Sequence, residues 1–140
     1  MSKMPRIQAV VLPILNSSFE GANPQVTVNT WVPAIKDRKF PFVLIRRVGG
    51  PRHAKRPTQL ALPVIEMTAY NTTNLIETDR LYDDALEALY AAVRNQTQTD
   101  AGYLHSMKET LGATEADSPF QDSWSVFGLI QLGLRPPHSQ

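Results

Sequence analysis

The residues most able to do chemistry in this sequence are a group of cations on one short stretch. Residues 45–57 contain five Arg or Lys side chains, two adjacent glycines and two prolines, and they contain no acid. The cations are Arg46, Arg47, Arg52, Lys55 and Arg56. Such a cluster can bind anions, which are either the phosphates of a nucleic acid or the carboxylates of a protein surface.

A second charged segment follows and has the opposite sign. Residues 77–87 hold five acids against a single base, Arg80. Four of the acids fall within a predicted helix: Asp79, Asp83, Asp84 and Glu87. Because the other face of that helix is apolar, we interpret these carboxylates as a solvated face rather than a catalytic cluster. The formal net charge of the chain is only +1, so attraction to a partner depends on such patches.

The sequence contains no motif that indicates catalysis, a metal or a cofactor. Its three histidines, His53, His105 and His138, lack the spacing of a metal site, and it has no cysteine. Gly49 and Gly50 do not form a phosphate-binding loop, because the Lys-Ser/Thr pair and the following helix are missing. We predict instead that these two glycines take positive φ in a backbone turn where a strand ends.

Three interpretations of the basic stretch remain. It could bind nucleic acid, but it offers no aromatic side chain for base stacking, and the chain has no recognition helix and no high pI. It could be solvated surface. It could contact the acidic surface of a neighbouring copy, and repetition of such a head-to-tail contact closes a ring if the rotation permits. The prolines would keep the arm extended, and the charges would set register and partner choice. The sequence favours this third interpretation, with a nucleic-acid-binding protein as the alternative.

The elements that position these charges can be predicted from apolar patterns. A strand at 42–48 is apolar on both faces early and cationic late, so it should run from the interior to an exposed end. A second strand at 60–70 should carry Pro63 near its beginning or on an edge. A long Ala-rich helix at 78–96 should be capped by Thr78. Its apolar face is predicted to consist of Tyr82, Ala85, Leu86, Leu89 and Val93.

Further elements complete the prediction. Ile7, Val10, Val11, Ile14 and Leu15 have helical spacing, and Pro13 should make that N-terminal helix short or kinked. We predict strands at 25–32, 103–111 and 123–136, with a polar loop at 112–122. The fold class is therefore α+β, a small and mainly antiparallel sheet packed by the N-terminal helix and the long helix.

We expect one domain over residues 1–140, with a short flexible tail at 136–140. No stretch approaches the length of a membrane span.

In this layout the chain resembles the tail terminator proteins of long-tailed phages, especially those that infect actinobacteria. The pattern includes a strand ending in Val32-Pro33 and a Pro-Phe-led strand that runs into "RRVGG" (residues 46–50) and a basic loop. An apolar strand, "VIEMTAY" (64–70), and an Ala-rich helix, "ALEALYAAV" (85–93), come next. A final strand ends in "LGLRP" (132–136). The likeness covers nearly the whole chain, and "RRVGG" followed by strand and helix is its most specific part.

The resemblance implies a structural virion protein without catalysis and without a cofactor. Such a subunit would form a homo-oligomeric ring, typically a hexamer, that caps the tail tube and ends its polymerisation. The ring would also join the tail to the head-side connector or stopper protein. Its partners would be further copies of itself, the tail tube protein and that connector, with no membrane. The protein would be assembled in the bacterial host cytoplasm and would reside in the tail-neck region. DNA would pass through the central hole, where a basic loop could touch it without reading sequence.

Overall fold

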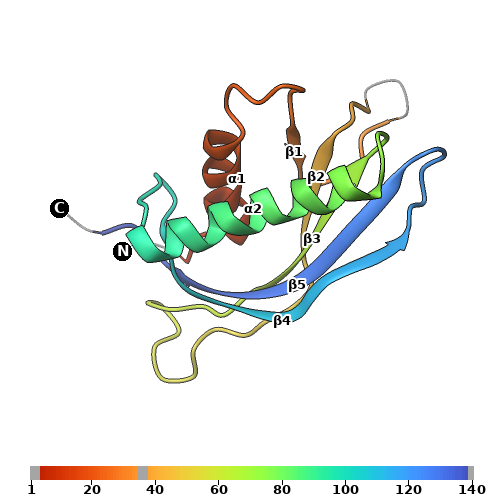
Figure 1. Ribbon diagram of the computed structural model, residues 1–140. Coiled ribbons are helices and arrows are strands. Elements are labelled where there is room, and N and C mark those ends of the chain that lie inside the picture. Colours follow the sequence, from red (N-terminus) through yellow and green to blue (C-terminus); the bar gives the residue numbers. More distant parts are fainter. Residues whose placement is uncertain (1–3, 35–37, 139–140) are drawn as a thin grey trace.

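The structure is a computed structural model that describes residues 4–34 and 38–138. It contains two helices and five strands in the described ranges. In chain order these are α1 (Ile7–Ser18), β1 (Thr27–Asn29), β2 (Phe42–Arg47), β3 (Val64–Asn71), α2 (Leu75–Asn95), β4 (Tyr103–Asp117) and β5 (Trp124–Arg135). The predicted α+β class is confirmed (Figure 1).

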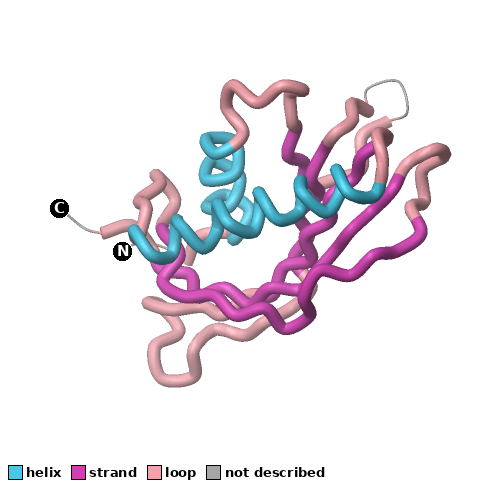
Figure 2. Tube along the Cα trace, in the orientation of Figure 1, coloured by secondary structure: helices cyan, strands magenta, loops and turns pink. Residues whose placement is uncertain are grey.

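The strands form one sheet in the order β1-β2-β3-β5-β4. β1 runs parallel to β2, and each of the other neighbouring pairs is antiparallel. Both helices lie on the same face of this sheet, as predicted (Figure 2). α1 packs against β1 and β2, whereas α2 packs against β3, β4 and β5. The main apolar core fills the space between the two layers.

The first helix owes its position to its apolar stripe. Its five buried residues are those that the spacing predicts: Ile7, Val10, Val11, Ile14 and Leu15. Pro13 lies inside the helix, which continues to Ser18. Since Pro13 has no N–H group, it cannot donate to the carbonyl of Ala9 one turn earlier.

The second helix begins three residues earlier than predicted, so the assignment of Thr78 as its cap is wrong. Asn74 is the N-cap, and its side-chain Oδ1 accepts a hydrogen bond of 2.7 Å from the backbone N–H of Glu77. Thr78 is fully buried inside the first turn, where its hydroxyl donates to the carbonyl of Asn74 at 2.8 Å. The sequence could not distinguish the two residues, because Asn and Thr are both common N-caps. The first turn also lacks a clear apolar pattern, because Ile76 is exposed.

The fourth strand is longer than predicted, and most of the expected loop at 112–122 is wrong. β4 continues through Asp117, which pairs with Trp124 of β5, and Glu115 pairs with Val126. The extension has no apolar pattern because β4 is an edge strand whose residues after 104 are largely exposed. Three register shifts interrupt its pairing. The predicted strand at 25–32 is also shorter in the structure, where β1 covers only Thr27–Asn29.

The strands that lead into and out of the basic stretch follow the prediction closely. β2 is buried over its first four residues and exposed at Arg46 and Arg47. β3 begins at Val64, directly after Pro63. The sheet therefore delivers the cations to an exposed end, as the sequence indicates.

A second, smaller cluster lies on the sheet face away from the helices. Phe42 alternates with the core residue Val43, so it points to the opposite face. It stacks on Tyr70 with ring centroids 4.8 Å apart, and Phe120 of the β4–β5 turn lies 4.9 Å from Tyr70. The guanidinium of Arg38 sits 4.0 Å from the Phe120 ring centroid. These contacts tie the turn to β2 and β3, and the sequence pattern alone did not predict them.

The first prediction concerns the buried face of α2. Replacing the fully buried Leu89 by Ala should lower the free energy of unfolding by about 2–5 kcal/mol, because it removes apolar contacts and leaves a cavity. The control is Ile76→Ala on the same helix, where the side chain is 64% exposed and about 0.5 kcal/mol or less is expected. Urea denaturation measures both, and equal midpoints for the two variants would contradict the packing described.

The second prediction uses the hydroxyl of Tyr82, which is buried and has no hydrogen-bond partner among the described residues. Burial, the negative charge of Glu109 and the phenol of Tyr90 together raise the pKa of Tyr82 from 10.0 to about 12, and burial is the largest of these causes. Below pH 10 both the folded and the unfolded protein keep the proton. Between pH 10 and about 12 only the unfolded protein loses it, so stability should fall across that window.

Tyr82→Phe should therefore flatten this alkaline loss of stability, which thermal unfolding at increasing pH measures. At neutral pH the variant should be as stable as the parent or more stable, because it removes an unpaired buried hydroxyl. Tyr90→Phe is the control at neutral pH. It should lower the stability there, because it removes the hydrogen bond of 2.6 Å from the Tyr90 hydroxyl to Glu109. A clear loss of stability in Tyr82→Phe at neutral pH would show that its hydroxyl has a partner.

Candidate functional site

The basic stretch is a hydrogen-bonded hairpin rather than an open loop. We call residues 48–64 the basic hairpin and residues 53–60 its tip. Its two arms continue the pairing of β2 and β3: Val48 donates to the carbonyl of Val64 at 2.8 Å, and Leu62 donates to that of Pro51 at 2.8 Å. The returning arm also pairs with β5, because Ala61 and Leu134 exchange two backbone hydrogen bonds of 2.9 and 2.8 Å. The arms are therefore fixed to the sheet.

The tip is closed by local hydrogen bonds. The backbone N–H groups of Gln59 and Leu60 both donate to the carbonyl of Arg56 at 3.0 Å. His53 also contributes, because its Nδ1 accepts from the backbone N–H of Lys55 at 3.2 Å. His53 thus supports the turn. In Figure 1 the hairpin projects from the sheet on the side away from the helices.

Two glycines allow the arms to approach. Gly49 and Gly50 have φ values of 116° and 93°, which matches the predicted positive φ. A Cβ atom on Gly50 would collide with the carbonyl oxygen of Leu62 and would lie 2.6 Å from the Cα of Pro63. Only glycine fits this position.

Three of the five cations contact other residues of the chain, and the other two are exposed without an ion pair among the described residues. Arg47 donates to the carbonyls of Gly49 and Gly50 at 3.3 and 2.8 Å, so it braces the turn. Arg46 lies 3.9 Å from Glu66 on the neighbouring strand, and Arg52 donates to the carbonyl of Pro57 at 3.3 Å. Lys55 and Arg56 are exposed at the tip and make no ion pair within the described ranges.

The acidic residues of α2 form an exposed face, as predicted. Glu77 pairs with Arg80 at 2.8 Å, and this is the only ion pair that α2 makes among the described residues. Asp79, Asp83, Asp84 and Glu87 therefore keep their charges for solvent or for a partner. Partial burial raises the pKa of Asp84 above its ordinary value, and the neighbouring Asp83 carboxylate raises it further.

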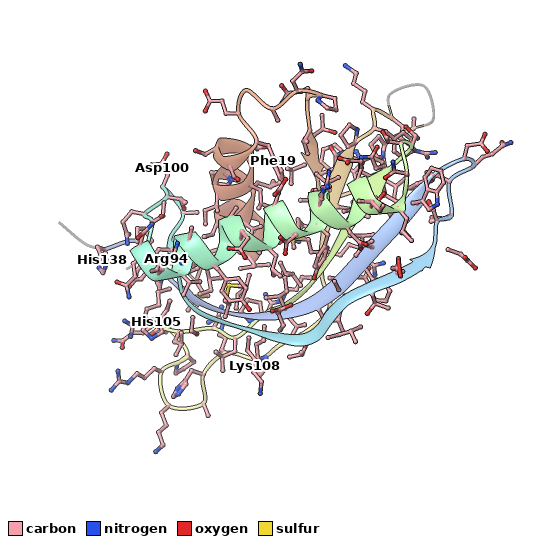
Figure 3. All side chains as sticks on the ribbon, viewed as in Figure 1. Phe19, Arg94, Asp100, His105, Lys108 and His138 are labelled. Atoms are coloured by element: carbon pink, nitrogen blue, oxygen red, sulfur yellow. The ribbon has the colours of Figure 1, made fainter. Side chains whose placement is uncertain are left out.

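The structure does not bring the two charged segments together within one chain. The acidic residues occupy the N-terminal half of α2 on the helical face of the sheet, and the hairpin projects at the other end and on the other side (Figure 1). The exposed residues His105 and Lys108 of β4, which Figure 3 labels, lie on the same side of the view as the hairpin. Neither charged segment can neutralise the other within one copy.

The described part of the chain shows neither a metal site nor a membrane helix. No three His, Asp or Glu side chains in it come together in a group that could hold a metal ion. None of its helices is long and apolar enough to cross a membrane. The residues after β5 that the structure describes, Pro136 to His138, contact the start of β4 and the loop before it. The His138 ring stacks on Tyr103 with ring centroids 4.6 Å apart, and the His138 N–H donates to Oε1 of Gln98 at 3.4 Å. Residues 139–140 of the expected flexible tail lie outside the described residues.

The sequence did not reveal the groove between the two helices. Its lining comes from α1, α2 and the loop that follows α2, and its volume is about 700 Å³. The walls are mainly small side chains, including Ala9, Pro13, Ala88 and Ala91. The frequent alanines in 85–93 indicated a helix face that allows close packing. The sequence could not show that α1 lies beside this face, because the two helices are far apart along the chain.

Comparison with known proteins identifies the family of this small α+β chain. Residues 3–140 match the family model described as phage tail termination protein. The chain belongs to this family, which makes it a structural protein of the phage virion and confirms the resemblance seen in the sequence.

Individual relatives agree with the assignment. The chain is 55% identical over 141 residues to the Gene 22 protein of Mycobacterium phage L5, with 99% of each chain covered. It is also 55% identical over 139 residues to the Gene 22 protein of Mycobacterium phage D29, again with 99% of each covered. A chain from a solved structure, the virion of a native gene transfer agent particle, shares the fold with a TM-score of 0.54 at 14% identity. That match covers 92% of this chain and 94% of the other.

The third prediction tests the construction of the hairpin. Gly50→Ala should destabilise the protein by about 1–3 kcal/mol, because a positive φ is strained for alanine and the new Cβ meets the opposite arm. Gly112→Ala is the control, since nothing lies within 4 Å of the added Cβ and its φ is not in the left-handed range. Thermal unfolding compares them, and a Gly50→Ala variant as stable as Gly112→Ala would contradict the paired geometry of the arms.

Proposed function

We propose that this protein forms a ring, typically a hexamer, that caps the phage tail tube and ends its polymerisation. The same ring joins the tail to the head-side connector or stopper protein. The subunit acts as one domain over residues 1–140 and works by assembly rather than by catalysis. The observation that carries the proposal is the separation of unpaired charges on one subunit, and membership in the tail termination family supports it.

Separated charges of opposite sign favour a head-to-tail contact between copies. Lys55 and Arg56 lie at the hairpin tip, and the acidic face of α2 lies at the other end of the same subunit. Each copy thus offers a cationic and an anionic surface to its two neighbours, and repeated contacts of this kind close a ring when the rotation permits. The charges mainly set register and choice of partner.

The hairpin is well suited to such a contact because its conformation is already fixed. Backbone hydrogen bonds join its arms to each other and to β5, so docking orders few additional residues.

Where a hairpin faces the central hole, it could also touch passing DNA through phosphates, without reading sequence. Specific nucleic-acid binding is the alternative, and the structure offers no exposed aromatic at the tip to favour it.

The fourth prediction tests the hairpin as an interface. Arg52→Glu, Lys55→Glu and Arg56→Glu together should weaken ring or tail association by about tenfold or more, because like charges would then face each other. Circular dichroism should stay unchanged, since all three side chains are exposed, as is the one hydrogen bond that is lost, from Arg52 to the Pro57 carbonyl. Negative-stain images of tails made with the variant should show overlong tubes that lack a cap.

A matched control separates position from net charge. Lys39→Glu with Lys108→Glu changes the charge by the same amount as Lys55→Glu with Arg56→Glu, at exposed sites outside the hairpin, and this variant should cap tails normally. Association of the parent protein should also weaken as salt rises above about 0.1 M, because exposed charges are screened. Normal capping by the hairpin variant would remove the hairpin from the interface, and tight DNA binding by the free subunit would favour the alternative.

A further inference from the structure

The groove between α1 and α2 is the largest of the described hollows on the surface. Because its walls are small side chains, a docked segment can bring its backbone close to both helices. Pro13 removes the donor that would pair with the carbonyl of Ala9, and both residues line the groove. The Ala9 carbonyl therefore lacks its usual helical donor.

Acidic side chains border this groove. Asp84 lies one turn before Ala88, and Glu87 lies one turn before Ala91, so both share the helix face that forms the wall. Asp100 lines the groove from the loop after α2 and is labelled beside the C-terminal end of that helix in Figure 3. None of the three acids makes an ion pair among the described residues.

The other acids of α2 face a different neighbour. Asp79, Asp83 and Asp84 line a smaller hollow of about 390 Å³ with Ala113 of β4. Asp84 thus adjoins both hollows, whereas neither Asp79 nor Asp83 lies one turn before a residue that lines the groove. The pair Asp84 and Glu87 can therefore be compared with the pair Asp79 and Asp83 by mutation.

The hairpin tip has the complementary features. Lys55 and Arg56 are exposed and unpaired within the described ranges, and the turn around them is held by its own hydrogen bonds. The hairpin projects on the sheet side opposite the helices, so it cannot enter the groove of its own chain (Figure 1). Only another copy can bring a tip to this groove.

We propose that the tip of one copy, residues 53–60, docks into the α1–α2 groove of the next copy. Lys55 and Arg56 then face Asp84, Glu87 and Asp100, and the alanine walls receive the tip backbone. This inference rests on the ring proposed above, and it specifies which surface of the neighbour receives the hairpin.

Disulfide trapping tests the contact directly, because the natural chain has no cysteine. The variant Lys55→Cys with Ala91→Cys should, in purified phage particles under mild oxidation, give a ladder of crosslinked species up to the full ring on a non-reducing gel. The matched control pairs Lys55→Cys with Glu115→Cys, an exposed position on β4, and should stay monomeric on the gel. Particles that assemble normally but give no ladder with Ala91→Cys would overturn the groove assignment.

Two further comparisons keep the test decisive if the cysteine pair impairs assembly. Ala91→Trp, which fills the groove, should block capping, whereas Glu115→Trp should not. Asp84→Lys with Glu87→Lys should block capping, and Asp79→Lys with Asp83→Lys should do so far less. Normal capping by Ala91→Trp, or equal loss from both pairs of lysine substitutions, would overturn the proposal. None of these outcomes would contradict the ring itself. The ring proposal would fail if the parent protein were present in the particles only as isolated subunits.

Discussion

The feature on which the charged surfaces depend is the continuation of antiparallel pairing beyond β2 and β3. The hydrogen bonds between Ala61 and Leu134, and those across Val48 and Val64, extend the sheet into the basic hairpin. Gly50 permits the close approach of the arms, and Arg47 braces the turn through the carbonyls of the two glycines. A cluster of cations that would repel one another on a free loop is thereby held at a fixed place on the subunit.

The same sheet also keeps opposite charges apart. Both helices pack on one face through the main core, so the acidic half of α2 lies on that side, and the hairpin leaves the sheet on the other. A subunit built in this way cannot satisfy its charges internally, and exposed charges of this kind contribute little to the stability of a single chain. In the ring proposed above, their role is to select and orient a neighbouring copy.

The sequence predicted the parts of this structure that depend on apolar periodicity or on backbone chemistry. The stripe of α1, the buried start and charged end of β2, the placement of Pro63 before β3 and the positive φ of the two glycines all follow from local rules. The errors occur where tertiary contacts decide. The outer half of β4 is exposed and polar, so only its pairing with β5 identifies it as a strand.

The candidate site shows the same limit. The charged residues could be found in the sequence, but their individual roles could not, since the bracing contacts of Arg47 and Arg52 require the folded turn. Asn74 and Thr78 are both acceptable caps by composition, and only the structure distinguishes them. The groove joins α1 to the far end of α2, and no local pattern records such a contact between distant segments.

The central claim is that neighbouring copies recognise each other through opposite charges, and exchanging those charges tests it most directly. One variant would carry Lys55→Glu and Arg56→Glu, and the other Asp84→Lys and Glu87→Lys. Alone, each should fail to cap tails, because its hairpin and its helix then carry like charges. Produced together in cells that make the tails, they should restore capped particles, with the two variants in equal amounts by mass spectrometry, since alternating copies make every contact attractive. Particles capped by either variant alone, or no capping by the mixture of two folded variants, would contradict the account.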